Sequence, residues 1–168
     1  MRVSARFTAA VCVAGLALAG CGSGNQSLTT APGPTPSTVA LDRVARAQKL
    51  HFVARAEMIC TVGEAKLIAA HFNAAHATLA QYKARYLHHA APIMLAELRQ
   101  LRALRPPVAD RATIAKLLAD LSLGIDQSIH AIESAKTVKQ ASKVPVPPGI
   151  VAANVDARAY GLPKCAAS

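Results

Sequence analysis

The sequence predicts an all-α protein built as a bundle of four or five helices, and three observations lead to this prediction. Alanine, the best helix former, is abundant, while the 168 residues include no Trp and only three Phe and three Tyr. Apolar residues recur three and four positions apart, as one face of a helix requires. Proline and glycine separate these stretches, and few runs of β-branched or aromatic residues indicate strands.

The first helical stretch covers residues 38–89, which contain no proline and one glycine, Gly63. It forms either one long helix or two helices with a break near Gly63 or Asn73. Pro92 fits the first turn of a new helix over residues 92–104, because that position needs no backbone N–H. The apolar side chains expected on or near the inner stripe of residues 38–89 are Phe52, Met58, Ile59, Val62, Leu67 and Leu79.

The clearest helical pattern covers residues 108–139. Gly124 lies within it and can allow a close helix contact or a slight bend. Residues 144–149, Val-Pro-Val-Pro-Pro-Gly, predict a stiff connection to a short last helix over residues 150–160, which Gly161 ends. The apolar seam expected along residues 108–139 consists of Ile114, Leu117, Leu118, Leu121, Ile125, Ile129 and Ile132.

Residues 1–20 have the three zones of a bacterial export signal. Arg2 and Arg6 make its start positive, and the apolar stretch 7–19 is shorter than the roughly 20 residues of a membrane-spanning helix. Residues 18–21, Leu-Ala-Gly-Cys, resemble the bacterial lipobox. The resemblance implies cleavage before Cys21 and attachment of acyl chains, such as palmitate, to it. The alternatives are an ordinary secretory signal with an incidental cysteine and an uncleaved helix.

This signal predicts three segments and a location. Residues 1–20 form the lipoprotein signal peptide, residues 21–37 the lipidated cysteine with a flexible Pro/Gly/Ser linker, and residues 38–168 the helical bundle domain. We expect an extracytoplasmic protein that a lipid anchors to the cell membrane, since two acyl chains give a stable anchor.

The charge of the chain bears on its partners. The signal carries two of the 19 basic residues and none of the nine acidic ones, which leaves a net charge of +8. The basic residues are spread along the chain, and nucleic acid is a poor partner for an exported protein. Besides the membrane, an envelope protein or an anionic surface is therefore the expected partner.

Two cysteines, Cys60 and Cys165, remain if Cys21 is lipidated. A disulfide between them is the default in an oxidising compartment. A pair of free thiols, a redox pair and a metal site are the alternatives, although the sequence has no C-x-x-C and no Cys/His pair at zinc spacing.

Three segments carry a resemblance to a protein family. They are residues 52–60, Phe-Val-Ala-Arg-Ala-Glu-Met-Ile-Cys, residues 101–107, Leu-Arg-Ala-Leu-Arg-Pro-Pro, and residues 159–165, Ala-Tyr-Gly-Leu-Pro-Lys-Cys. Together they resemble a group of small, uncharacterised actinobacterial exported lipoproteins with a helical domain and a "YGL..C" ending. The resemblance covers most of residues 52–165, and it implies the helical fold and the Cys60–Cys165 pairing but no activity.

Few residues suggest a cofactor site or catalysis. Tyr82, Tyr86 and His89 lie at i, i+4 and i+7, so one face of a regular helix could present them to a haem iron, for which Tyr and His are ligands. Three polar aromatic residues at this spacing more often form the rim of a bundle. The six histidines lie scattered, and no enzyme motif is present. We therefore expect no metal, no cofactor and no enzymatic activity.

Two functions remain as hypotheses. The first is a lipid-anchored binding or interaction module of the cell envelope. The alternative is a carrier of a small ligand, haem among the candidates, that uses a cavity between the helices. A pocket of several hundred cubic ångströms in the bundle would favour the carrier, and a filled interior would exclude it.

Overall fold

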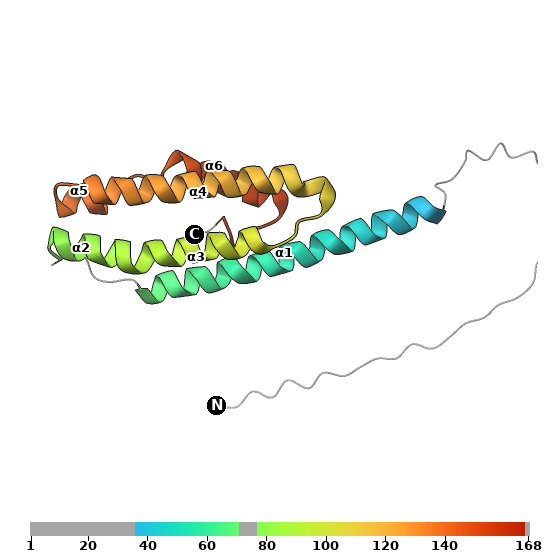
Figure 1. Cartoon of the computed structure of the whole chain (residues 1–168), viewed down its shortest axis with the longest axis horizontal. Coiled ribbons are helices and arrows are strands. Elements are labelled where there is room, and N and C mark those ends of the chain that lie inside the picture. Colours follow the sequence, from blue (N-terminus) through green and yellow to red (C-terminus); the bar gives the residue numbers. More distant parts are fainter. Residues whose placement is uncertain (1–35, 71–76, 167–168) are drawn as a thin grey trace, which may run out of the picture. The chain divides into compact units, whose positions relative to one another are not determined.

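The computed structural model describes residues 36–70 and 77–166, and it confirms the all-α prediction: these residues contain no strand (Figure 1). The predicted signal peptide, Cys21 and the linker up to residue 35 lie outside the described residues. No helix of the described part is long and apolar enough to cross a membrane. The helices are α1 (Pro36–Ala70), α2 (Leu79–Arg85), α3 (Ala91–Ala103), α4 (Arg111–Ser134), α5 (Val138–Ser142) and α6 (Pro148–Tyr160), with a π-helical turn η2 (Tyr86–Ala90) and a 3-10 turn η3 (Val108–Asp110).

The order of helix contacts is α1, α3, α4, α6. α1 packs on α3, α3 packs on α4, and the most extensive contact joins α4 to α6. Figure 1 shows α2, η2 and α3 as one continuous rod that runs alongside α4, with α5 near the end that carries α2.

The stretch 38–89 is divided, since α1 ends at Ala70 and α2 begins at Leu79, which agrees with the predicted alternative of two helices with a break near Asn73. Pro92 lies in the first turn of α3, as predicted, but α3 follows η2 directly and does not begin as a separate helix. Proline inside a helix lacks an N–H and clashes with the carbonyl group four residues earlier. The π-helical turn η2 directly precedes Pro92, and in it the N–H of Ala91 donates to the carbonyl oxygen of Tyr86, five residues back. A wider turn of this kind lets the helix continue past the proline.

Capping residues explain the other new boundaries. The stretch 108–139 is a 3-10 turn, α4 and a separate α5, rather than one helix. α2 and α5 each begin with a capping box, in which Thr78 pairs with Gln81 and Thr137 pairs with Gln140. A threonine followed three residues later by glutamine satisfies two free N–H groups, so each pair starts a new helix.

The main core lies where α1, α3, α4 and the end of α6 meet. Phe52 on α1 and Tyr160 on α6 pack edge to face, with ring centroids 5.9 Å apart. The Tyr160 hydroxyl donates to Asp110 Oδ2 at 2.6 Å. Met58 and Val62 are exposed, contrary to the predicted stripe. The buried residues of this cluster are Phe52, Ala56, Cys60, Leu101, Ile114, Leu117, Ala157, Tyr160, Leu162 and Ala166.

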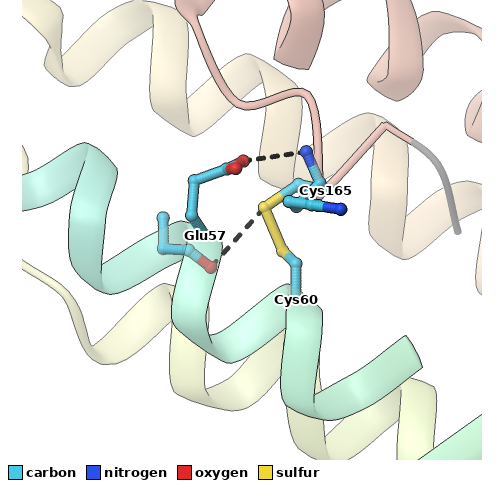
Figure 2. The surroundings of a disulfide bond; sticks show 5 residues. Glu57, Cys60 and Cys165 are labelled. Carbon is cyan, nitrogen blue, oxygen red and sulfur yellow. Dashed lines mark hydrogen bonds between the residues drawn. A yellow bond between two sulfur atoms is a disulfide. The ribbon is translucent and has the colours of Figure 1, made fainter. Parts of the chain in front are cut away.

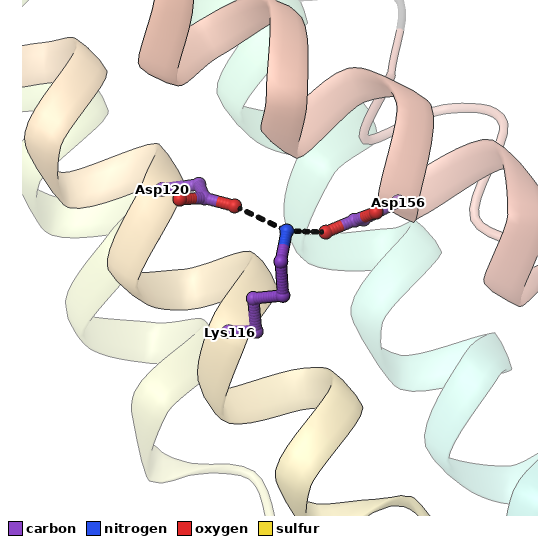
Figure 3. Close-up of polar contacts among 3 residues, drawn as sticks. All are labelled: Lys116, Asp120 and Asp156. Carbon is purple, nitrogen blue, oxygen red and sulfur yellow. Dashed lines mark hydrogen bonds and ion pairs between the residues drawn. The ribbon is translucent and has the colours of Figure 1, made fainter.

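α4 and α6 approach so closely that glycine is required on both helices. A Cβ on Gly149 would lie 2.7 Å from the carbonyl oxygen of Asp120, and a Cβ on Gly124 would lie 2.7 Å from Ile150 Cγ1. The prediction that Gly124 permits a close helix contact is therefore confirmed. On the surface of the same pair, Lys116 on α4 bridges two carboxylates at 2.9 and 2.6 Å, Asp120 on α4 and Asp156 on α6 (Figure 3).

The C-terminal segment folds back onto α1. α6 ends at Gly161, whose φ of 99° is a left-handed conformation that favours glycine. The predicted disulfide between Cys60 and Cys165 is present, and it joins residues 105 positions apart (Figure 2). Beside it, the backbone N–H of Lys164 donates to Glu57 Oε1 at 2.9 Å. The tail is thus covalently attached to the C-terminal half of α1.

Candidate functional site

A cavity of about 310 Å³ lies within the bundle. Its walls come from α1, α3, α4 and α6, and residues 144–147 of the proline-rich connection close one side. Most of the lining is apolar. Representative lining residues are Leu67 on α1, Met94 and Leu101 on α3, Leu118, Leu121 and Ile125 on α4, and Ile150 and Ala153 on α6.

The predicted seam of α4 faces the cavity. Ile114, Ile125 and Ile132 are buried, and Leu118 and Leu121 are half-buried. All five residues line the cavity. Their side chains thus point into the bundle as the periodicity predicted, but they do not fill its interior.

The uncharged polar groups of the lining come from several elements. Tyr86 lies within hydrogen-bond reach of Ser128, and burial raises the pKa of the Tyr86 hydroxyl. Ser128 also donates to the carbonyl oxygen of Gly124 at 2.9 Å. Tyr82 and Asn154 are further lining residues. A mainly apolar cavity with a few polar groups is the usual form of a small-molecule site.

Among the described residues that line the cavity, Glu97 on α3 is the only acidic one, and none is a Lys, Arg or His. It is only 9% exposed. Burial raises its pKa to about 7, because an apolar environment disfavours the charged form. No hydrogen bond or ion pair joins its carboxylate to any other described residue. A titratable group of this kind in a cavity is a functional-site candidate.

Glycine on the neighbouring helix makes room for this carboxylate. A Cβ on Gly63 of α1 would clash with Glu97 Oε2. α1 is therefore not broken at Gly63, which was one of the two predicted break positions. The missing side chain at Gly63 leaves room for the side chain of Glu97. The Glu97 carboxylate thus lies against Gly63, and Glu97 is also a lining residue of the cavity.

The three haem candidates do not meet at one point. Tyr82 and Tyr86 line the cavity, but His89 is exposed and is not a lining residue. The π-helical turn from Tyr86 to Ala90 changes the helical phase between the tyrosines and His89. The expected common face of Tyr82, Tyr86 and His89 is therefore absent. The described residues also contain no group of three His, Cys, Asp or Glu side chains placed to hold a metal ion.

Comparison with known protein families, curated proteins and solved structures finds no match to this chain. The resemblance to actinobacterial lipoproteins therefore stays a prediction, and the site has to be interpreted from its own residues.

Sequence reasoning missed Glu97, although the pattern contained a signal for it. Glu97 lies three residues after Met94 and four before Leu101, within the predicted inner stripe of α3. A single acidic residue inside an apolar stripe indicates a buried carboxyl group. The cavity itself left no comparable signal in the sequence.

Proposed function

We propose that this chain is a lipid-anchored protein of the cell envelope whose helical domain binds a small, mainly apolar molecule in its interior. The observation that carries the proposal is the cavity of about 310 Å³ with its apolar lining. Small-molecule pockets have volumes of about 300 to 1,000 Å³. An apolar cavity of about 150 Å³ holds one benzene molecule. The expected ligand therefore has one or two rings or a chain of medium length.

The location in this proposal is supported by the sequence of residues 1–21. If Cys21 carries the anchor, intact mass of the chain from the membrane fraction of its host will show loss of residues 1–20 and a gain of acyl chains. The variant Cys21→Ala will lack both changes. A wild-type chain without the added mass of acyl chains would contradict the lipid anchor on Cys21. It would not affect the proposal of ligand binding, which has its own test.

A binding measurement tests the cavity directly. The full chain is reconstituted in nanodiscs of zwitterionic lipid and titrated with 1-methylnaphthalene, with empty nanodiscs as the blank for partitioning. The chain has no Trp, so energy transfer from Tyr82 and Tyr86 in the lining to the naphthalene ring reports binding. We expect saturable binding at one site.

Ala153→Leu should abolish this binding, because Ala153 is 3% exposed and lines the cavity. Ala159→Leu on the same helix is the matched control, since Ala159 is exposed and does not line the cavity. If Ala153→Leu does not fold, Leu121→Phe adds volume at a half-buried lining position. Equal binding by all four proteins, or no saturable binding by the wild type, would refute the proposal.

A second candidate, interaction with an envelope protein, is favoured by the first part of α1. Every residue from Val39 to His51 is exposed, including Leu41 at 67%, Val44 at 55% and Leu50 at 64%. Figure 1 shows this end of α1 clear of the other helices. A photocrosslinker at position 44 in the native host should then capture one defined protein, and Leu41→Glu should prevent the capture. A crosslinker at exposed position 155 on α6 is the control, and equal products from both positions would exclude a specific interface on α1.

A further inference from the structure

We propose that Glu97 binds the ligand of this cavity directly and selects apolar molecules that carry a protonated amine. This inference rests on the proposed function, because it requires that the cavity takes up a ligand. It adds the chemical class of that ligand.

The first argument is the position of Glu97. Glu97 is 9% exposed, lines the cavity and has no hydrogen-bond or ion-pair partner among the described residues. No side-chain N or O atom of the described residues is both fully buried and without a partner, so the Glu97 carboxylate keeps some access to solvent. Its unused acceptors are therefore open to a hydrogen-bond donor that enters the cavity.

The second argument is the charge of the surroundings. None of the described Lys, Arg or His residues belongs to the cavity lining. A ligand carboxylate or phosphate would meet no cation there and would be repelled by Glu97. The charge that the described lining offers is therefore negative, and it favours a ligand that carries a positive group.

The third argument is the ionisation of Glu97. Its pKa of about 7 means that little free energy is needed to ionise the side chain near neutral pH. An ammonium group then replaces the missing partner and forms a charge-assisted hydrogen bond. Such bonds are shorter and stronger than those between neutral groups. A ligand hydroxyl group would satisfy the same acceptor less strongly.

Four probes of nearly equal size test the proposal on the full chain in nanodiscs. They are 1-methylnaphthalene, 1-naphthalenemethanol, 1-naphthylmethylamine and 1-naphthoate. We expect the wild type to bind the amine at least about tenfold more tightly than 1-methylnaphthalene and to bind naphthoate weakest, as one charge-assisted bond implies. In Glu97→Gln the preference for the amine should disappear, while the affinity for 1-methylnaphthalene stays within about twofold.

Gly63→Ala provides a second variant that retains the acidic group. The added methyl group clashes with Glu97 Oε2 and so displaces the carboxylate. We expect it to weaken amine binding while 1-methylnaphthalene still binds. A wild type that binds 1-methylnaphthalene without preferring the amine, or a preference that survives in Glu97→Gln, would overturn the role of Glu97 and leave the proposed function intact. Failure of 1-methylnaphthalene to bind at all would instead overturn the proposed function.

Discussion

The carboxyl group of Glu97 couples the stability of the fold to pH. Burial raises its pKa from 4.5 to about 7 in the folded protein. Between these two values the folded state keeps a proton that the unfolded state has lost, so the free energy of unfolding falls as pH rises. The contribution of Glu97 is fully present below the unfolded pKa and is lost once the pH has passed the folded pKa. The shift corresponds to at most about 3 kcal/mol.

Glu97→Gln should therefore be more stable than the wild type at alkaline pH. Glutamine has the shape of the neutral acid and cannot ionise, so the two proteins should be nearly equal near pH 4 and differ by up to about 3 kcal/mol near pH 8. Urea unfolding of both proteins at the two pH values measures the difference in their free energies of unfolding. Contributions from groups that titrate in both proteins cancel in this difference. A difference independent of pH would show that Glu97 ionises as an exposed acid does.

For single residues, the sequence predicted the disulfide correctly but missed Glu97 and placed His89 wrongly. Cys60 and Cys165 were paired correctly because only two cysteines remain for a disulfide once Cys12 and Cys21 are assigned to the predicted signal and its lipid anchor. Glu97 was missed because its importance comes from what surrounds it, and helical spacing says nothing of distances between helices. His89 was placed with Tyr82 and Tyr86 because regular periodicity does not foresee a π-helical turn.

For single helices, the apolar periodicity predicted which face is buried, whereas local capping and turn contacts determined where the helices begin and end. The apolar seam of α4 was predictable because side chains three and four apart must share a face. The extension of that helix to residue 139 was wrong, since Thr137 and Gln140 cap a separate helix. The path past Pro92 depends on a π-helical turn, and no periodic pattern marks such a turn in advance.

The crossing of α4 and α6 gives a prediction about glycine. Gly124→Ala should lower the free energy of unfolding by about 1 to 3 kcal/mol, because the new methyl group meets the backbone of Ile150, which cannot move aside locally. This loss should occur although alanine favours a helix by about 1 kcal/mol over glycine. Thermal and urea unfolding measure the change.

Gly63→Ala is the matched control for this prediction. It makes the same replacement inside a helix, but the new methyl group meets only the end of the flexible Glu97 side chain. Its free energy of unfolding should stay close to that of the wild type or rise. Equal losses in Gly124→Ala and Gly63→Ala would mean that the glycine contact between α4 and α6 does not limit their approach.

At the scale of the whole molecule, the interior depends on how α1 is held. α1 has extensive contacts with α3 but with none of α4, α5 and α6. Further attachment comes from the ring contact of Phe52 with Tyr160 at the end of α6, and from the C-terminal segment through the Cys60–Cys165 disulfide and the bond from Lys164 to Glu57. Since Phe52, Ala56 and Leu67 of α1 line the cavity, this attachment also holds one of its walls.

Removing the disulfide should therefore reduce both stability and binding. For a separation of 105 residues, loop entropy predicts a loss of about 4 to 5 kcal/mol in the double variant Cys60→Ala/Cys165→Ala. Because α1 loses its covalent link to the tail, affinity for 1-methylnaphthalene should fall as well. Urea unfolding and probe titration of the double variant measure the two effects, and the wild type reduced with dithiothreitol should match it in both. If the double variant keeps its stability but loses the probe, the disulfide acts on the cavity wall alone, and the loop-entropy argument fails for this fold.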